Sequence, residues 1–255
     1  MSMSGWKAQL ESFESLLKEI SEVREDRRLR FDRSCVIASD VAGQFYCEKK
    51  VEMRYVHGEV ETEAMSAGTE AHEGMAEGAV KVEKEELWRK IYGKRPVLAL
   101  EMFLAARHGD VILAGRPDSV LFSGGVPLVV FEYKFSKSSA AYHSYHVQAQ
   151  VYCALLEEMG FDVSRLFYAV VVADPGAKGG RELRRGVVKA VKTNGQKLAV
   201  LSADGATIYV NGYNRASLEK DLEWALRFWD KSRDAEPSRN ANKCMKCEYR
   251  DECKI

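Results

Sequence analysis

Residues 115–134, GRPDSVLFSGGVPLVVFEYK, contain two apolar runs separated by a glycine-rich turn. This arrangement is typical of a β-hairpin, with SGG at 123–125 as the turn. Because side chains alternate between the two faces of a strand, Glu132 and Lys134 are expected on one face with Val130, and Tyr133 on the other. The hairpin therefore carries a carboxylate and an ammonium group side by side at the end of a very apolar strand.

Charged groups in such a place are costly to desolvate unless they neutralise each other or bind a metal ion. Asp118, near the start of the partner strand, can bring a second carboxylate to the same edge. Carboxylate oxygens are ligands for Mg²⁺ or Mn²⁺, and a lysine can position water or neutralise developing charge on a phosphate. The spacing predicts a two-carboxylate metal nuclease site. The alternative is a surface hairpin in which Glu132 and Lys134 merely end a strand.

The composition, 46% hydrophobic and 30% charged, is that of a soluble globular protein. A chain of 255 residues is long enough for one elaborated domain with a full core. Basic and acidic residues balance at 38 each, so binding of nucleic acid needs a local basic patch. The longest apolar run, residues 126–131, is too short to cross a bilayer, and the charged first residues lack a signal-peptide core. We therefore expect a cytoplasmic protein with no membrane partner.

A local basic patch occurs at residues 176–197, where seven basic residues and one acidic residue leave a net charge of +6. In an otherwise neutral protein this composition predicts contact with the phosphate backbone of DNA. A solvated β-hairpin is the alternative interpretation. The candidate DNA-binding residues are Lys178, Arg181, Arg184 and Arg185.

Hydrophobic periodicity divides the rest of the chain into helices and strands. Helices are expected at residues 6–20, 35–55, 66–80, 140–159 and 217–230, and further strands at 97–107, 111–114 and 166–173. The expected organisation is an amphipathic helical extension at 1–33, a nuclease core at 34–230 with a basic insertion at 174–215, and a cysteine-rich segment at 231–255.

Four polar residues outside the hairpin are candidates for the same site. Gln148 and Tyr152 lie one helical turn apart and offer an amide and a phenol to one patch; the alternative is a tyrosine packed on the sheet beside an exposed glutamine. His72 can bind a metal ion through a neutral ring nitrogen, although a lone histidine is usually structural. Glu101 is either an additional acidic group or an outward-facing strand residue.

Cysteines cluster near the C-terminus, as Cys244, Cys247 and Cys253. In a cytoplasmic protein such clusters more often hold metal or iron–sulfur than form disulfides. The spacing predicts three ligands of a centre that needs a fourth, for which Cys47 is the best candidate. Zinc in a four-cysteine site is the simplest choice. The centre would join the two ends of the nuclease fold and should be structural.

Together these features resemble the RecB-like nucleases of the PD-(D/E)XK superfamily. The resemblance rests on Cys47, G-x-x-x-H at 68–72, GRPD at 115–118, EYK at 132–134, QAQVY at 148–152 and the terminal cysteines. It is greatest to the branch with an iron–sulfur-stapled nuclease domain, which includes the CRISPR-associated exonucleases of spacer acquisition and the AddB-type nuclease domains. It covers residues 35–160 and 237–255.

The resemblance implies a restriction-endonuclease-like α/β fold, with a mixed sheet flanked by helices. It implies the following roles: Mg²⁺ or Mn²⁺ bound by His72, Asp118, Glu132 and the Tyr133 carbonyl; action on the attacking water by Lys134; and substrate held by Gln148 and Tyr152. It also implies a cluster on Cys47, Cys244, Cys247 and Cys253, most often 4Fe–4S, with Zn²⁺ as the alternative.

The activity implied is that of an exonuclease on single-stranded DNA, in CRISPR spacer acquisition or in DNA repair. Its implied partners are DNA and the CRISPR adaptation proteins, and the pattern is also compatible with a homo-oligomer. The sequence has no P-loop motif, so this chain is not the helicase part of such a machine. The alternative function is a non-catalytic DNA-end-binding or assembly subunit that keeps the nuclease fold and the cluster.

Overall fold

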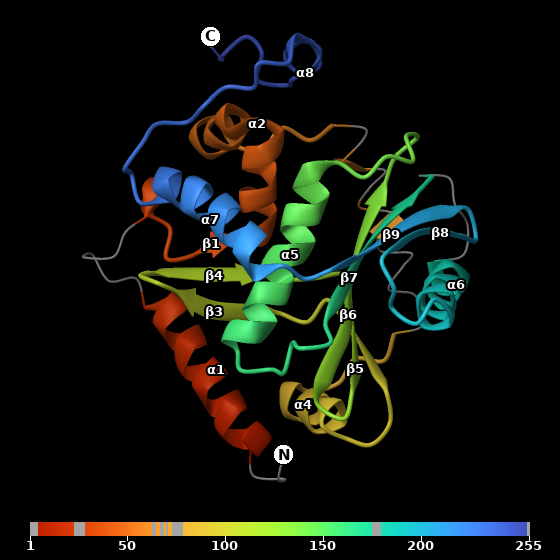
Figure 1. Ribbon diagram of the computed structural model, residues 1–255. Coiled ribbons are helices and arrows are strands. Elements are labelled where there is room, and N and C mark those ends of the chain that lie inside the picture. The colour runs from red at the N-terminus through yellow and green to blue at the C-terminus, as the bar shows by residue number, and fades with distance from the viewer. Residues whose placement is uncertain are drawn as a thin grey trace.

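The computed structural model describes residues 5–22, 29–62, 65–66, 69, 71–72, 79–174 and 180–253. Figure 1 labels the elements. The helices are α1 (Gly5–Ser21), the 3-10 turn η2 (Arg30–Asp32), α2 (Ala38–His57), α4 (Lys84–Ile91), α5 (His143–Glu158), α6 (Gly180–Thr193), α7 (Arg215–Trp229) and α8 (Ala241–Met245). The strands are β1 (Val36–Ile37), β2 (Val97–Leu100), β3 (Leu104–His108), β4 (Val111–Gly115), β5 (Ser119–Ser123), β6 (Val126–Phe135), β7 (Phe167–Ala173), β8 (Ala199–Ala203) and β9 (Ala206–Gly212).

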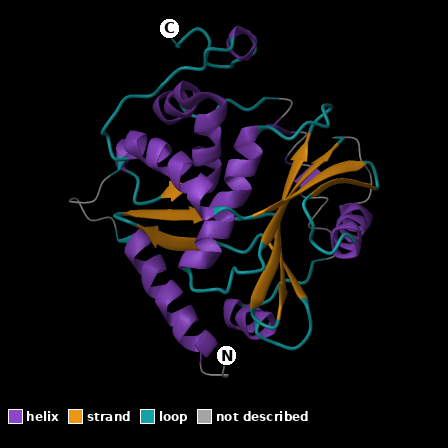
Figure 2. Cartoon of the chain, viewed as in Figure 1, coloured by secondary structure: helices purple, strands orange, loops and turns teal. Residues whose placement is uncertain are grey.

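The described strands form two sheets with helices around them (Figure 2). The smaller sheet has the order β1-β4-β3 and the larger one the order β2-β5-β6-β7-β9-β8. β6 pairs antiparallel with β5 and parallel with β7, so the larger sheet is mixed. The expected mixed α/β fold with flanking helices is therefore confirmed. The chain crosses from the smaller to the larger sheet at residues 116–118, within the GRPD segment.

The predicted hairpin is confirmed as β5 and β6. Its turn contains Gly124 and Gly125, both with positive φ, a conformation that glycine adopts without a steric penalty. Val130 belongs to one buried cluster, whereas Phe131 and Tyr133 belong to a second cluster on the other face of the sheet. The alternation that the sequence predicts thus separates the two cores.

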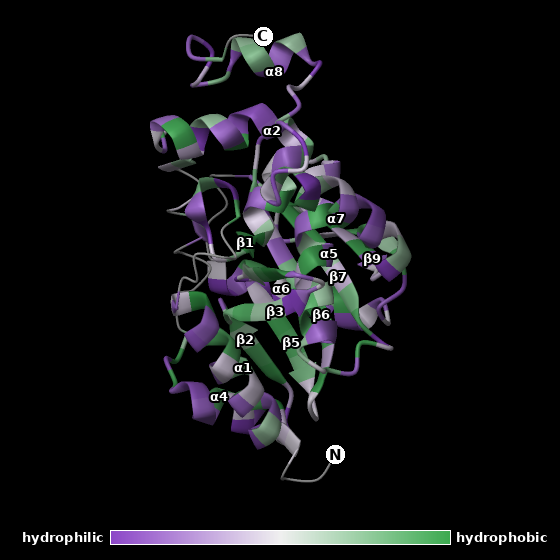
Figure 3. Ribbon diagram, turned by 90° about the vertical axis from the view of Figure 1, so that its left-hand side faces the viewer, coloured by the Kyte–Doolittle hydropathy of each residue, from purple (hydrophilic) through white to green (hydrophobic). Residues whose placement is uncertain are grey.

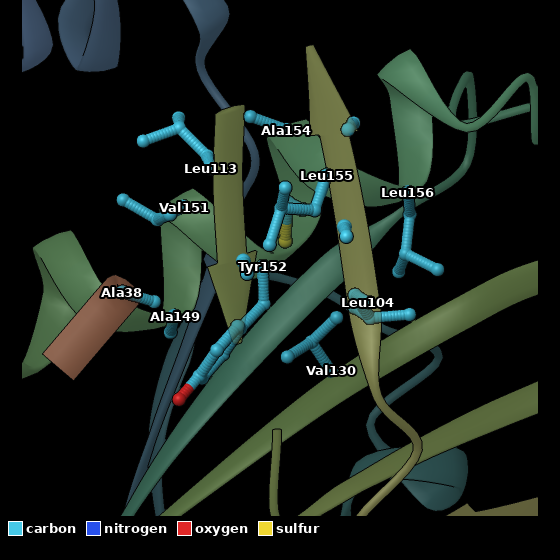
Figure 4. Packing of buried hydrophobic residues seen from close by; sticks show 14 of the residues in the cluster. Ala38, Leu104, Leu113, Val130, Ala149, Val151, Tyr152, Ala154, Leu155 and Leu156 are labelled. Carbon is cyan, nitrogen blue, oxygen red and sulfur yellow. The ribbon is translucent and has the colours of Figure 1, made fainter. Parts of the chain in front are cut away.

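Helix α5 occupies the centre of the main core. It is buried along almost its whole length between residues 147 and 156, because it packs against α2 and against strands of both sheets. Figure 4 shows Leu104 and Leu113 from the smaller sheet and Val130 from the larger sheet around the α5 side chains Leu155 and Leu156. Even its polar residues Gln148 and Gln150 are buried. The core therefore holds α5 rigidly against β6.

The single strand expected at residues 97–107 is wrong. The run divides at Glu101, whose φ is +47°, into β2 of the larger sheet and β3 of the smaller one. Hydrophobicity continues through Met102, which is buried, so the periodicity hides the break. The chain changes sheets here as it does between β4 and β5.

The basic segment is not a β-hairpin alone, because residues 180–193 form α6, before β8 and β9. Leu183, Val187 and Val191 of α6 are buried in the second cluster, on the face of the larger sheet opposite α5. Figure 1 shows α6 at the outer side of this sheet. The segment thus adds a helix and two strands to the fold.

The two ends of the described chain attach at different places. At the N-terminal end, α1 buries Trp6, Leu10 and Phe13 in the main core, as the helical spacing predicts. The C-terminal segment with α8 lies beyond α2 (Figures 1 and 3). In Figure 3 hydrophobic residues concentrate on the inner strands, and hydrophilic ones on the outer helices. Across the described residues, each helix is too short or too polar to cross a bilayer.

Candidate active site and cysteine-lined cavity

Asp118 directly precedes β5 and is held from two sides. Its Oδ2 accepts a hydrogen bond from the Tyr133 backbone N–H at 2.6 Å. Its Oδ1 lies 3.3 Å from His72 Nδ1, and the His72 ring meets Phe135 edge-on with the ring centroids 5.1 Å apart. The hairpin register and the aromatic contact therefore bring the predicted aspartate and histidine together.

Glu132 and Lys134 connect the hairpin to α5. Lys134 Nζ lies 2.7 Å from Glu132 Oε1 and donates to Gln148 Oε1 at 3.0 Å. Gln148 Nε2 in turn donates to the Tyr152 hydroxyl at 2.9 Å. The structure thus brings these four predicted residues into one hydrogen-bonded chain, and Gln148 is buried rather than exposed.

Gly115, the first residue of GRPD, allows Tyr152 to approach this chain. A Cβ at position 115 would lie 2.6 Å from the Tyr152 ring and 3.0 Å from the Ala38 Cβ. Such a distance is far shorter than the contact distance of carbon atoms, about 3.5–4.0 Å. Glycine is therefore required for the tyrosine to reach its place under the strand.

Glu132 is the group whose surroundings best suit a cation. Its side chain is almost fully buried, and among the described residues its Oε2 has no hydrogen-bond partner. The pKa of the Glu132 carboxyl is raised to about 7, chiefly by burial and also by the nearby Asp118 carboxylate, against the opposing effects of Lys134 and His72. A buried carboxylate oxygen without a partner, beside a second carboxylate, fits a divalent metal ion.

The charge of Lys134 depends on the same carboxylates. Burial lowers the pKa of its ammonium group, but Glu132 and Asp118 more than compensate, so the net pKa is raised. The Lys134 Nζ also lies 5.3 Å from the centre of the Tyr145 ring, a cation–π contact that the sequence did not reveal. Lys134 therefore stays a cation in this state of the site.

The Tyr133 carbonyl is oriented by the strand itself. The N–H and C=O of one strand residue point to the same edge, and the N–H of Tyr133 points to Asp118. The pairing of β5 with β6 ends at Ser119 and Phe131, before Tyr133. The carbonyl therefore faces the Asp118 side of β6, beyond the end of the ladder.

Glu101 and Arg184 line a small pocket together with His72 and Asp118. The Glu101 N–H donates to the Asp118 carbonyl at 3.2 Å, so Glu101 lies at the strand break and is not an outward-facing strand residue. Arg184 comes from α6. Burial and the Asp118 carboxylate raise the pKa of the Tyr133 phenol, and the Arg184 guanidinium opposes this rise without cancelling it. The sequence predicted Arg184 only as a DNA ligand and did not reveal its position beside the carboxylates.

The other basic candidates lie on α6 or outside the described residues. Arg181 and Arg185 are exposed on α6, and Arg184 is half-buried. Lys178 lies outside the described residues.

The four predicted cysteine ligands line one cavity of about 470 Å³ between α2 and the C-terminal segment. Cys47 interrupts α2, with φ −167° and ψ 110°. Burial raises the pKa of the Cys253 thiol, and the neighbouring Cys47, Cys247 and Cys244 raise it further. Cys35 and Cys153 are buried elsewhere in the main core.

The C-terminal segment is attached to α2 by several polar contacts. Lys243 Nζ donates to the Tyr46 carbonyl at 2.8 Å, and Lys50 Nζ lies 2.9 Å from Glu248. The buried Tyr249 hydroxyl donates to the Gly58 carbonyl, also at 2.8 Å. In the described part of the chain, no three His, Cys, Asp or Glu side chains are grouped so that they could hold a metal ion as placed.

Comparison with known proteins gives one family. The family model described as "PD-(D/E)XK nuclease superfamily" matches residues 13–254. A solved structure, "Crystal structure of SSO0001", aligns with 99% of this chain and 96% of its own, at 15% sequence identity and a TM-score of 0.48. The search of curated protein sequences finds no match.

Proposed function

Since the chain belongs to the PD-(D/E)XK nuclease superfamily, we propose that it is a Mg²⁺- or Mn²⁺-dependent deoxyribonuclease that acts as an exonuclease on single-stranded DNA. The observation that carries this proposal is Glu132. One of its oxygens is buried without a hydrogen-bond partner in the described structure, beside Asp118 and Lys134. If this end of the strand bound no cation, burial of the Glu132 carboxylate would carry a high desolvation cost.

In the proposed site, Asp118, Glu132, His72 and the Tyr133 carbonyl would hold the divalent ion. When bound, the ion lowers the pKa of a coordinated water and polarises the scissile phosphate. The Tyr133 N–H fixes one oxygen of Asp118, which leaves the other oriented toward His72. The chain thus supplies two oriented carboxylates before any ligand arrives.

Lys134 would act at the water and at the phosphate. Its ammonium group can donate a hydrogen bond to the water, and it can neutralise the charge that develops on the phosphate oxygens. Gln148 orients Lys134 through its Oε1, and Tyr152 orients Gln148. Gln148 and Tyr152 would also present polar groups to the substrate once Lys134 turns to the phosphate.

A cleavage assay tests the proposed activity. Single-stranded DNA labelled at one end should be shortened in Mn²⁺ or Mg²⁺ and remain intact in EDTA, because the proposed hydrolysis requires the metal ion. The same strand closed into a circle separates the two modes of cutting, since an exonuclease needs an end and should leave the circle intact. If strands are bound but never shortened with either metal, the result would contradict the proposed nuclease activity and favour a non-catalytic DNA-end-binding or assembly subunit.

We further propose that Cys47, Cys244, Cys247 and Cys253 hold a structural iron–sulfur cluster. The donor set, four thiols that line one cavity, supports this, because cysteine thiolates are the usual ligands of iron–sulfur clusters. Bound there, the cluster would fix the C-terminal segment to α2. Zinc on the same cysteines is the alternative.

Purification without oxygen tests the cluster. The protein is expected to be brown and to contain iron and acid-labile sulfide, and Cys253→Ser should lose both because one ligand is missing. Cys35→Ser, which replaces a buried thiol outside the cavity, is the control and should keep the colour. A colourless protein with one zinc per chain would replace the cluster by zinc and leave the nuclease proposal intact.

For the biological role we propose CRISPR spacer acquisition or DNA repair, with CRISPR adaptation proteins as partners in the first case. The order of the motifs from Cys47 to Cys253 supports this proposal. The genes next to this one distinguish the two roles, because adaptation genes beside it would favour spacer acquisition.

A further inference from the structure

Helix α6 has two opposite faces of different character. Leu183, Val187 and Val191 form the buried face against the larger sheet. Arg181, Arg185, Lys189 and Lys192 follow one another at spacings of four, four and three residues, and all four are exposed. This spacing places them on one side of the helix. The net charge of the segment is thus concentrated on one outward stripe.

Three residues of this stripe, Arg185, Lys189 and Lys192, line a groove of about 350 Å³. The groove is lined by four basic residues, Arg184, Arg185, Lys189 and Lys192, together with Leu98 of β2, Val188 and Thr193. None of these lining residues is acidic. Asp204 approaches α6 at Gly186, which does not line the groove. The groove is therefore lined by basic and apolar residues together.

The groove leads to the candidate active site through Arg184. This residue lines the groove and also lines the small pocket that contains His72, Asp118 and Tyr133. A chain of phosphates along α6 would therefore reach the carboxylates without crossing an acidic surface of the groove.

We infer that the groove between α6 and β2 binds the sugar–phosphate backbone of single-stranded DNA and guides that strand to the carboxylate site. This inference rests on the proposed function, because it assigns the groove to the strand that the site cleaves. Basic side chains contact the phosphates, and Leu98 and Val188 contact the sugars. Among the described residues no aromatic side chain lines the groove, so these residues supply no platform for base stacking and the groove should bind with little sequence preference.

The salt dependence of DNA binding tests the groove. The protein and its Arg185→Gln/Lys189→Gln/Lys192→Gln variant are titrated with fluorescent oligo-dT at several salt concentrations. Divalent cations are omitted, so that a metal-dependent nuclease does not cut. Each lost phosphate contact should reduce the slope of log K against log salt by about 0.7, so three lost contacts should reduce it by about 2.

Two matched variants control for charge and for folding. Lys220→Gln/Arg227→Gln/Lys231→Gln removes the same charge from exposed positions on or next to α7 and should leave the slope within measurement error of the original. Arg185→Lys/Lys189→Arg/Lys192→Arg keeps every charge of the groove and should retain the slope. All three side chains replaced in the groove are exposed, so the core against the sheet is preserved.

The outcomes separate this inference from the proposed function. If the original protein cuts DNA but the groove variant has the same slope as the α7 variant, the assignment of the groove to DNA binding is wrong and the nuclease proposal stands. If the slope of the groove variant falls by about 2 but the original protein never cuts DNA, DNA binding in the groove is supported and the proposed nuclease activity is wrong. An equal fall in slope with blunt duplex DNA would overturn the assignment to a single strand.

Discussion

Lys134→Ala is expected to reduce the rate of DNA cleavage at least ~100-fold, the cost of removing one group that stabilises charge in a transition state. Lys134 is the ammonium group held between Glu132 and Gln148, 2.7 and 3.0 Å from their oxygens. Asp118→Asn should cause a loss of similar size, because it weakens the binding of the divalent ion. The rate of shortening of an end-labelled strand in Mn²⁺ measures both losses.

Lys134→Arg distinguishes two roles of the lysine. Arginine keeps the positive charge but does not release a proton near neutral pH. If Lys134 acts by charge alone, the arginine variant should recover much of the rate, whereas a role in proton transfer predicts no recovery. Lys220→Ala, an exposed lysine of α7, is the control and should cut normally. Full Mn²⁺-dependent cleavage by both Lys134→Ala and Asp118→Asn would end the nuclease proposal for this site.

Glu48→Ala is expected to lower the free energy of unfolding by about 3–5 kcal/mol, the cost of removing one partner of a buried ion pair. The Glu48 carboxylate has no solvent-exposed surface and binds both terminal nitrogens of Arg233, one of them at 2.7 Å. It also accepts the Glu236 backbone N–H at 2.7 Å and the Gln44 amide. The substitution therefore removes the buried counter-charge of Arg233 and leaves its guanidinium near the exposed Glu236 carboxylate, 3.9 Å away. Chemical denaturation measures the loss.

The same contact connects stability to the cysteine cavity. Glu48 follows Cys47 in α2. The Glu48–Arg233 ion pair and the hydrogen bond from the Lys49 N–H to the Glu236 carbonyl, at 3.3 Å, attach the start of the C-terminal segment to α2. Glu48→Ala should therefore also reduce the retention of metal by the four cysteines. Lys84→Ala breaks an exposed pair with Glu14 and should cost no more than about 1 kcal/mol. A Glu48 variant as stable as the Lys84 variant would contradict the buried-pair argument.

Local patterns predicted most of the elements near the candidate site. The glycine turn and the period-2 alternation of residues 115–134 predict β5, β6 and the faces of Val130 and Tyr133, as the structure confirms. The apolar run of β7 and the helical spacing in α1, α5 and α7 were also sufficient. These properties depend on neighbours close in the chain, so the sequence contains them directly.

Contacts between distant residues were not predictable in the same way. The break at Glu101 separates two sheets, although hydrophobicity is continuous across it. Glu48 and Arg233 are 185 residues apart, and nothing in either neighbourhood indicates the partner. The basic composition of residues 176–197 suggested DNA contact, but only the helical form of α6 aligns its cations on one side.

The amino-acid sequence alone determined which chemical groups the molecule has and in which local elements they lie: two carboxylates and a lysine on a hairpin, an amide and a phenol on one helix face, and four cysteines at two ends of the chain. The tertiary structure determined which other groups lie next to them. It left one oxygen of Glu132 without a partner among the described residues, and it brought Arg184 beside Asp118. The reason is physical: hydrogen bonding and periodicity act over a few residues, whereas burial and electrostatic coupling depend on packing between elements remote in sequence.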